Sequence, residues 1–287
     1  MSRAAEVYER AIRKEFAFLK ATDAIDQLHA RSIVLPDRKG LLVPVCALHA
    51  DDAALVTTLA RWREQSSFAF PTQFPVSEAG TARWLRAGVL EVADRVLFLV
   101  CDRHGHPAGH LGFANALAGE REMEIDNVVR GEDVEPGLMS AAMDALVAWA
   151  EEMFAPREIH LRVFEDNDRA VRFYERLGFI REGVTPLRRE ERDGGVVAYV
   201  PAADGPADRR FLRMAYAPDR SGETGKILTA GPSMSAREAG YALDAVRTGW
   251  NDHWADYLDA FTETFAGYIG VPYAIPMSSC TAALHLS

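Results

Sequence analysis

Acidic residues at every second position mark one short stretch near the middle of the chain. In REMEIDNVV, Glu122, Glu124 and Asp126 alternate with other residues. An alternation of period two predicts a β-strand with the carboxylates on one face and the intervening residues, through Asn127, on the other. A carboxylate on such a face can remove a proton from an attacking nucleophile. Glu124 and Asp126 are therefore candidate general bases, and a solvated strand face explains the pattern equally well.

Three histidines, His104, His106 and His110, precede this strand. Two of them fall in DRHGHP, whose polar, glycine and proline content predicts a hairpin connection between two strands. No carboxylate stands at helical spacing to them, so surface histidines are favoured over a metal site. His110, on the second strand of the hairpin, is a third candidate for the base.

The order of elements after the acidic strand predicts a βαβ crossover. The loop RGEDVEPG is followed by a helical stretch, LMSAAMDALVAWAEEMF, and by a second strand, EIHLRVF. Such a loop presents free backbone N–H groups at a helix N-terminus, where the helix dipole also favours an anion. The site suits a phosphate, but many βαβ units bind none, so the pattern alone leaves ligand binding open.

The elements before the crossover must support it. Apolar residues at helical spacing over residues 4–20 predict an amphipathic helix that packs in the core or faces a partner. These residues are Val7, Tyr8, Ile12, Phe16 and Leu19. A strand is expected at 41–48, and Asp51 with Asp52 predicts the start of a helix that runs to about Arg63.

The proline-bearing stretch at 66–80 predicts a loop, from which Ser77 and Glu78 start the next helix. Aromatic side chains of this region could line an acceptor site, although core packing is the stronger interpretation for the tryptophans. They are Trp62, Phe68, Phe70, Phe74 and Trp84.

Composition narrows the classes of function. The formal net charge is −10 and the sequence pI about 5.3, so the surface field repels nucleic acid and anionic membranes. No stretch of about 18 apolar residues could span a bilayer, and the N-terminus lacks the apolar core of a signal peptide. The three cysteines form no CxxC pair, so neither a disulfide framework nor a zinc site is expected. We expect a cytoplasmic protein.

A more specific signature lies in NDRAVRFYERLGF, residues 167–179. It resembles the N-x-x-A-x-x-F/L-Y-x-K/R-x-G-F stretch of the GNAT superfamily of acyl-CoA-dependent N-acetyltransferases. The matching residues are Asn167, Ala170, Phe173, Tyr174, Arg176, Gly178 and Phe179. The resemblance covers about residues 40–217 and implies an α/β (α+β) fold, with a mixed central sheet flanked by helices and acetyl-CoA as cosubstrate.

This resemblance also implies roles for residues around the crossover. The loop and helix start at 130–139 would hold the CoA pyrophosphate on backbone amides, although the family pattern Q/R-x-x-G-x-G/A fits VEPGLM only at Gly137. Tyr174 would give a proton to the departing thiolate, and Asn167 would contact the pantetheine arm or the local backbone. A backbone N–H near Val128 or Val129 would stabilise the oxyanion. The expected cofactor-binding residues are Val128, Val129, Arg130, Gly131, Pro136, Gly137, Leu138, Met139, Asn167, Ala170 and Phe173.

The last 60 or so residues resemble a second family. AGPSMS, the Gly249–Trp250 pair, the stretch from Phe261 to Val271 and SSCTAALHL are similar to the start of the DegT/DnrJ/StrS family of PLP-dependent sugar aminotransferases. The resemblance implies that the turn at 280–282 meets the PLP phosphate, with Cys280 where the family usually has glycine. No Schiff-base lysine follows, so we expect no aminotransferase activity and no working PLP site.

Together the resemblances divide the chain into four parts. We expect an N-terminal helical extension at 1–38, a GNAT domain at 39–217, a linker at 218–225 and the beginning of an aminotransferase at 226–287. An aminotransferase of that family installs an amine on a nucleotide-linked keto sugar, and an N-acetyltransferase consumes an amine. The expected reaction is therefore acetylation of a nucleotide-linked amino sugar by direct attack of the amine on acetyl-CoA.

Two alternatives remain at this point. One is acetylation of protein N-termini, of the ribosomal-protein type, and the other is a non-catalytic acyl-CoA-binding module that regulates an aminotransferase. The imperfect pyrophosphate loop supports the second. No nucleic acid or membrane partner is expected, a homodimer is compatible with the sequence, and the acceptor and acyl length stay open.

Overall fold

The computed structural model describes residues 3–202, 207–217, 236–250 and 253–277. The chain divides into two compact units, Met1–Thr229 and Ala230–Ser287, and each is described by itself. The linker expected at 218–225 and the turn expected at 280–282 lie outside the described residues.

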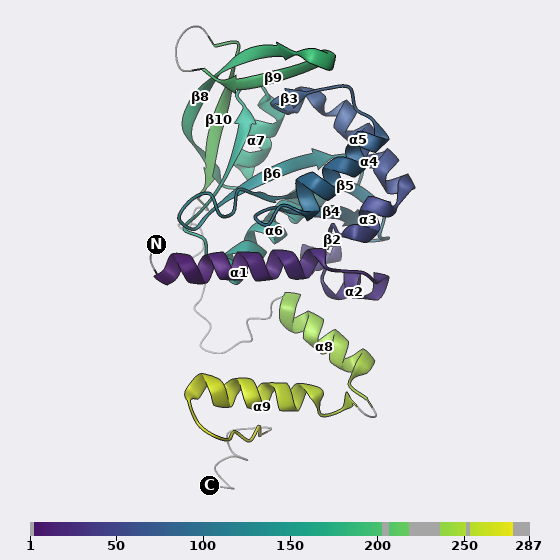
Figure 1. The fold of residues 1–287 in the computed structure, drawn as a ribbon, viewed down its shortest axis with the longest axis vertical. Helices are drawn as coiled ribbons and strands as arrows, with labels where there is room; N and C mark the ends of the chain where they lie inside the picture. The colour runs from purple at the N-terminus through teal and green to yellow at the C-terminus, as the bar shows by residue number, and fades with distance from the viewer. Residues whose placement is uncertain (1–2, 203–206, 218–235, 251–252, 278–287) are drawn as a thin grey trace. The chain divides into compact units, whose positions relative to one another are not determined.

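The strands of the first unit form a mixed sheet in the order β1-β2-β4-β5-β6-β7-β10-β8-β9-β3 (Figure 1). Their bounds are β1 Ile33–Val34, β2 Gly40–Pro44, β3 Thr72–Gln73, β4 Val96–Asp102, β5 Pro107–Ala114, β6 Glu122–Arg130, β7 Glu158–Phe164, β8 Phe179–Arg192, β9 Val196–Pro201 and β10 Arg209–Tyr216. Only the β6–β7 pair is parallel among the described strand pairs. The mixed sheet with flanking helices confirms the fold class expected from the sequence.

The parallel pair separates along its length. The β6–β7 register runs from Glu122 opposite Glu158 to Ile125 opposite Leu161 and goes no further. Beyond Ile125, β6 continues to Arg130 without β7 as a partner. The two strands therefore part at the point where β6 leads into the crossover loop.

Helices cover both faces of the sheet. They are α1 Arg3–Lys20, α2 Ile25–Ala30, α3 Ala47–Asp51, α4 Ala53–Gln65, α5 Glu78–Arg83, α6 Leu138–Phe154 and α7 Asp168–Arg176, with a π-helix η3 Trp84–Leu90 and 3₁₀ turns η1 Pro36–Arg38, η2 Ser67–Ala69 and η4 Asp193–Gly195. Phe98 of β4 packs against Trp149 of α6, whereas the adjacent Leu97 and Leu99 share a core with Trp62 of α4. Since neighbouring strand residues point to opposite faces, α6 and α4 lie on opposite sides of the sheet.

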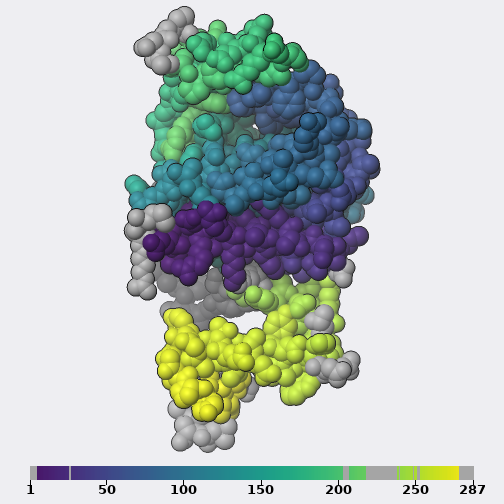
Figure 2. Space-filling model, viewed as in Figure 1, coloured from purple at the N-terminus to yellow at the C-terminus, as the bar shows by residue number. Residues whose placement is uncertain are grey.

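Helix α1 belongs to the core of this unit, as its apolar spacing allowed. Phe16 is fully buried and stacks on Trp149 at a centroid distance of 6.4 Å, and Ile12 and Leu19 are also buried. Val7, which the spacing placed on the same stripe, is instead 56% exposed. Figure 2 shows α1, in purple, lying along one side of the unit.

The local start and stop signals agree with the structure at several places. Asp52 caps α4 by accepting hydrogen bonds from the N–H groups of Ala54 and Leu55, and Ser77 caps α5 in the same way. The strand expected at 41–48 is shorter, because β2 ends at Pro44 and α3 begins at Ala47.

The second unit contains α8 Ala236–Thr248 and α9 Asp256–Ile269. Helix α9 ends at Gly270, which takes the left-handed conformation with φ of 76°. The Tyr257 hydroxyl donates to Asp244, which ties the two helices together. Among the described residues, no helix has the length and apolar character needed to cross a membrane.

Candidate active site

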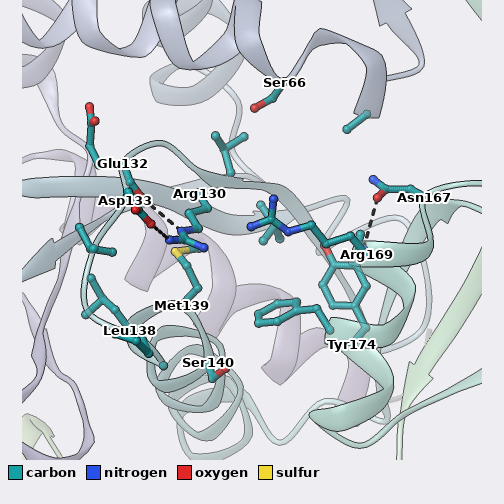
Figure 3. A pocket seen from close by; sticks show the side chains of 18 of the residues that line it. Ser66, Arg130, Glu132, Asp133, Leu138, Met139, Ser140, Asn167, Arg169 and Tyr174 are labelled. Carbon is teal, nitrogen blue, oxygen red and sulfur yellow. Dashed lines mark hydrogen bonds and ion pairs between the residues drawn. The ribbon is translucent and has the colours of Figure 1, made fainter.

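A pocket of about 660 Å³ opens where β6 and β7 part (Figure 3). Its walls come from the end of β6, the crossover loop, the first turn of α6, helix α7 and the η2 segment. Of the residues expected to bind acetyl-CoA, those that line it are Val128, Val129, Arg130, Pro136, Gly137, Leu138, Met139, Asn167, Ala170 and Phe173. Tyr174 lines it as well, so one cavity gathers the crossover loop and the signature helix.

The first turn of α6 gives the pocket its backbone donors. Gly137 is the N-cap, with a φ of 86° that L side chains rarely adopt. Leu138 N–H donates to Glu135 O, whereas the N–H groups of Met139 and Ser140 have no acceptor within the helix. These amides and the helix dipole suit an anion at this end of the pocket.

The arginine side chains around the pocket differ in how far their charges are already paired. Arg130 pairs with Asp133 and also donates to Glu132 O, so its charge is partly engaged. Arg169 and Arg176 of α7 line the pocket, and their side chains form no hydrogen bond or ion pair with any described residue. Figure 3 shows the Arg169 guanidinium pointing into the cavity. The sequence reasoning missed Arg169 because no motif position marks it.

Gly131, expected to help bind phosphate, is placed elsewhere. It does not line the pocket, and its N–H donates to Ala108 O at 2.9 Å. A Cβ built on Gly131 would lie 2.0 Å from Cε2 of the buried Trp62 ring. Glycine is therefore needed here so that the loop can pack on Trp62.

We expect Gly131→Ala to lower the free energy of unfolding by about 3 kcal/mol, because the methyl group must displace a fully buried ring. Chemical denaturation of the first unit measures the change. Gly183→Ala is the matched control, since a Cβ there would have no atom within 4 Å. Equal stabilities for the two variants would contradict the packing role.

Tyr174 projects from α7 into the pocket and is 8% exposed. Burial raises the pKa of its phenol, and the negative charge of Asp126 raises it further. The phenol therefore stays protonated at neutral pH and can donate a proton. Asn167 caps the same helix by accepting from Ala170 N–H at 3.2 Å, which is the local-backbone role among the two expected for it.

Asp126 lies on β6 just before the lining residues and is half-buried. Burial raises the pKa of its carboxyl, while the Arg95 guanidinium, 3.0 Å from Oδ2, lowers it. Asn127 Nδ2 also donates to Oδ2 at 2.6 Å. Although Asp126 does not line the pocket itself, its negative charge raises the pKa of Tyr174.

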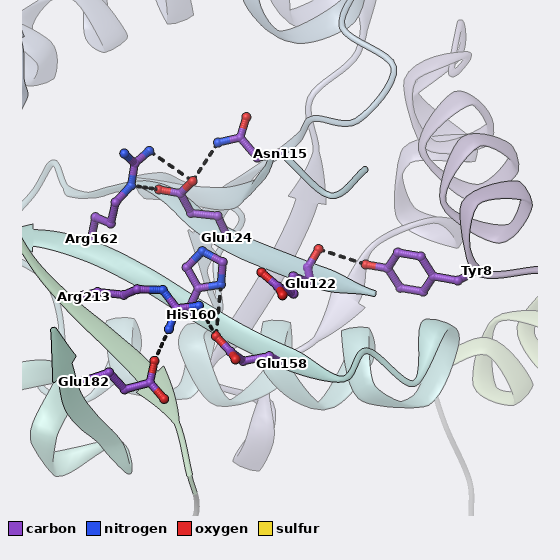
Figure 4. Close-up of polar contacts among 9 residues, drawn as sticks. All are labelled: Tyr8, Asn115, Glu122, Glu124, Glu158, His160, Arg162, Glu182 and Arg213. Carbon is purple, nitrogen blue, oxygen red and sulfur yellow. Dashed lines mark hydrogen bonds and ion pairs between the residues drawn. The ribbon is translucent and has the colours of Figure 1, made fainter. Parts of the chain in front are cut away.

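Glu124 is more fully engaged than Asp126 (Figure 4). Arg162 reaches it through Nε at 2.6 Å and Nη2 at 3.2 Å, and Asn115 Nδ2 donates to Oε2 at 2.7 Å. The carboxylate is buried and outside the pocket. Both oxygens are occupied, so Glu124 is the weaker of the two carboxylate candidates.

His110 is buried beside the rings of Trp62 and Trp84, not at the surface. Its Nδ1 lies 2.7 Å from Asn127 O, and since a carbonyl only accepts, Nδ1 carries the proton. Burial lowers its pKa to about 4, so the ring is neutral at pH 7 with a lone pair on Nε2. His104 and His106 are exposed in the β4–β5 turn, as expected.

Asn127 does not continue the strand alternation. Its φ of 54° is left-handed, and its side chain is half-buried instead of joining Met123 and Ile125 in the core. In this conformation the backbone carbonyl of Asn127 accepts from His110, and its side-chain amide donates to Asp126. No group of three or more histidine, cysteine or acidic side chains that could hold a metal ion occurs in the described part of the chain.

Comparisons with known proteins agree with this geometry. Residues 41–180 match the family model described as acetyltransferase (GNAT) domain, and residues 232–287 match the DegT/DnrJ/EryC1/StrS aminotransferase family. No curated protein matches the chain.

The chain is similar to several solved structures. The chain is similar to the ribosomal-protein alpha-N-acetyltransferase RimL in complex with coenzyme A, at 16% identity over 65% of this chain and 98% of that one, with a TM-score of 0.50. A GCN5-related N-acetyltransferase from Brucella melitensis is 19% identical over 63% of this chain and 76% of its own, with a TM-score of 0.48. Spermidine N-acetyltransferase SpeG from Vibrio cholerae is 16% identical over 61% and 93%, with a TM-score of 0.44.

Proposed function

The chain carries a GNAT acetyltransferase domain at residues 41–180, and we propose that this domain acetylates the amino group of a nucleotide-linked amino sugar. The observation that carries the reaction type is the position of Tyr174, whose buried, protonated phenol lines the pocket formed by the crossover loop. The presence of an aminotransferase-family match on the same chain supports an amine acceptor of that kind.

The proposed reaction is direct transfer. The amine nitrogen attacks the thioester carbonyl carbon, and the carbon–sulfur bond then breaks. Asp126 takes the proton that the amine loses, and Tyr174 supplies a proton to the departing thiolate. The open edge of β6 at Val128 and Val129 is the proposed place for the oxyanion donor, since β7 does not pair there.

A screen of acceptors tests the substrate. Free CoA release is measured with acetyl-CoA and the 3-, 4- and 6-amino nucleotide sugars, beside peptide N-termini and spermidine. Turnover of an amino sugar alone supports the proposal, and preference for peptide N-termini replaces it. Binding of CoA without thioester consumption for any amine would indicate a non-catalytic module.

Arg169 is proposed to hold a phosphate of CoA from the α7 side. We expect Arg169→Gln to weaken CoA binding about tenfold by removing one charge-assisted hydrogen bond, with a smaller effect at high salt. Isothermal titration measures the dissociation constant. Arg172→Gln, on the same helix but outside the pocket, is the matched control and should bind CoA normally. Equal dissociation constants for Arg169→Gln and the unmodified protein would contradict the role.

A further inference from the structure

A side chain outside the pocket, Arg209 of β10, joins two of the pocket's walls. Its Nη1 donates to Phe68 O at 3.0 Å, and Phe68 lines the pocket from the η2 segment. Its Nε and Nη2 donate to the two carboxylate oxygens of Asp166, at 2.9 and 2.6 Å. Asp166 directly precedes Asn167, which lines the pocket and caps α7. One guanidinium therefore bridges the η2 segment and the start of α7.

The surroundings of Arg209 fix its position. Its guanidinium carbon lies 3.4 Å from the ring centroid of the fully buried Phe164 and 5.2 Å from that of Tyr199. The side chain is 16% exposed, and a bidentate arginine–carboxylate pair sets the orientation of its partners as well as their distance. A pair that also stacks on a buried ring holds neighbouring segments better than an isolated surface ion pair does.

The wall that Arg209 holds from the η2 side consists of Ser66, Phe68 and Ala69, and we call it the η2 wall. Its turn is closed by a local hydrogen bond from Ala69 N–H to Ser66 O at 3.0 Å. The Phe68 side chain is 59% exposed, so packing leaves much of its ring open to the pocket. Figure 3 shows Ser66 across the cavity from Ser140 of α6, whose backbone amide suits the CoA phosphates. The η2 wall is therefore left for the acceptor.

We infer that Arg209 is a positioning residue, which holds the Phe68 ring on the acceptor side of the pocket and so sets the space between that ring and α7. The inference rests on the proposed function and deepens it, because it assigns the η2 wall to acceptor binding. The Phe68 ring contacts the acceptor, and Arg209 acts only through the placement of that ring.

Two arginines that are adjacent on β10 provide a matched test. Arg209→Gln removes the bridge. Arg210→Gln is the control, because Arg210 points to the other side of the strand and pairs at 3.6 Å with Glu165 from an exposed position. Phe68→Ala removes the ring, and a double variant combines Phe68→Ala with Arg209→Gln. For each, kcat and KM are measured with the amine that the acceptor screen identifies, beside the dissociation constant for acetyl-CoA.

We expect Arg209→Gln and Phe68→Ala each to raise KM for the acceptor about tenfold, with a smaller change in kcat, because the acceptor loses a fixed wall. Binding of acetyl-CoA should stay within about twofold, since the α6 amides and the Asn167 cap remain. The double variant should be no worse than Phe68→Ala alone. Additive losses in the double variant, or an unchanged acceptor KM in Arg209→Gln, would overturn the inference.

A second pair of variants keeps the test decisive if Arg209→Gln melts early. The Asp166 side chain is 61% exposed, so Asp166→Ala cuts the bridge from the α7 side without opening a cavity in the core. Glu165→Ala is its control, since Glu165 pairs with Arg210. A rise in acceptor KM for Asp166→Ala alone supports the bridge, and equal KM values in the two variants reject it.

Hydrogen exchange separates this inference from the proposed reaction. Backbone exchange over residues 66–70 is measured by mass spectrometry on the CoA-bound protein. Arg209→Gln should speed it about tenfold, and Arg210→Gln should leave it unchanged. If the unmodified protein acetylates no amine, the proposed function fails and this measurement decides alone. Faster exchange in Arg209→Gln then supports its hold on the η2 wall, and equal exchange in the two variants overturns it.

Discussion

Replacing Tyr174 by phenylalanine is expected to lower kcat about 100-fold, because the departing thiolate loses its proton donor. The phenol is buried and faces the pocket, and its raised pKa keeps it protonated across the neutral range. The ring itself packs against Phe173 and Phe179, contacts that phenylalanine can keep. The dissociation constant for acetyl-CoA should therefore change little, and rate and binding together check the prediction.

Tyr8→Phe is the matched control for this substitution. Tyr8 is also buried and has a raised pKa, but its hydroxyl donates to Glu122 O at 3.2 Å, outside the pocket. We expect Tyr8→Phe to reduce stability slightly and to leave kcat unchanged. If Tyr174→Phe retains full turnover across the pH range, Tyr174 has no part in the mechanism.

Local signals predicted the crossover well, because each one acts within a few residues. Helix α6 begins and ends where its apolar stripe does, and α7 begins after its Asn167 cap and ends at Arg176, shortly before Gly178, whose φ is 86°. The crossover loop and the signature helix also lie close together in the sequence, which is why they could be expected to share one site. Their meeting requires only a parallel strand pair joined by a helix.

Residues whose roles depend on distant partners could not be found in this way. Gly131 looked like part of an anion-binding loop. Glycine is required there because the ring of Trp62, nearly 70 positions away in the sequence, packs against it. Asn127 leaves the strand alternation because its left-handed backbone serves His110 and Asp126.

The second large effect on activity is expected from replacing the general base, for which Asp126 is favoured over Glu124. Asp126→Asn is expected to lower kcat/KM about 100-fold by removing the general base. The carboxyl accepts a proton only when ionised, and burial raises its pKa, so the acid limb of activity should lie above the usual range for aspartate. The acceptor amine must also be unprotonated before it can attack, so a second proton has to be lost as the pH rises. Log kcat/KM should therefore rise with slope two below the pKa of Asp126 and with slope one above it.

In Asp126→Asn only the slope of one should remain, since the amine alone still titrates. Asp144→Asn is the control, because burial also raises the pKa of Asp144, yet the charge of this α6 residue acts on Tyr216, whereas that of Asp126 acts on Tyr174. Glu124→Gln should keep both slopes, since Arg162 and Asn115 already occupy its carboxylate. Loss of the steeper limb in Glu124→Gln, with its retention in Asp126→Asn, would transfer the role of base to Glu124. Retention in both carboxylate variants would leave the neutral Nε2 of His110 as the acceptor of the proton.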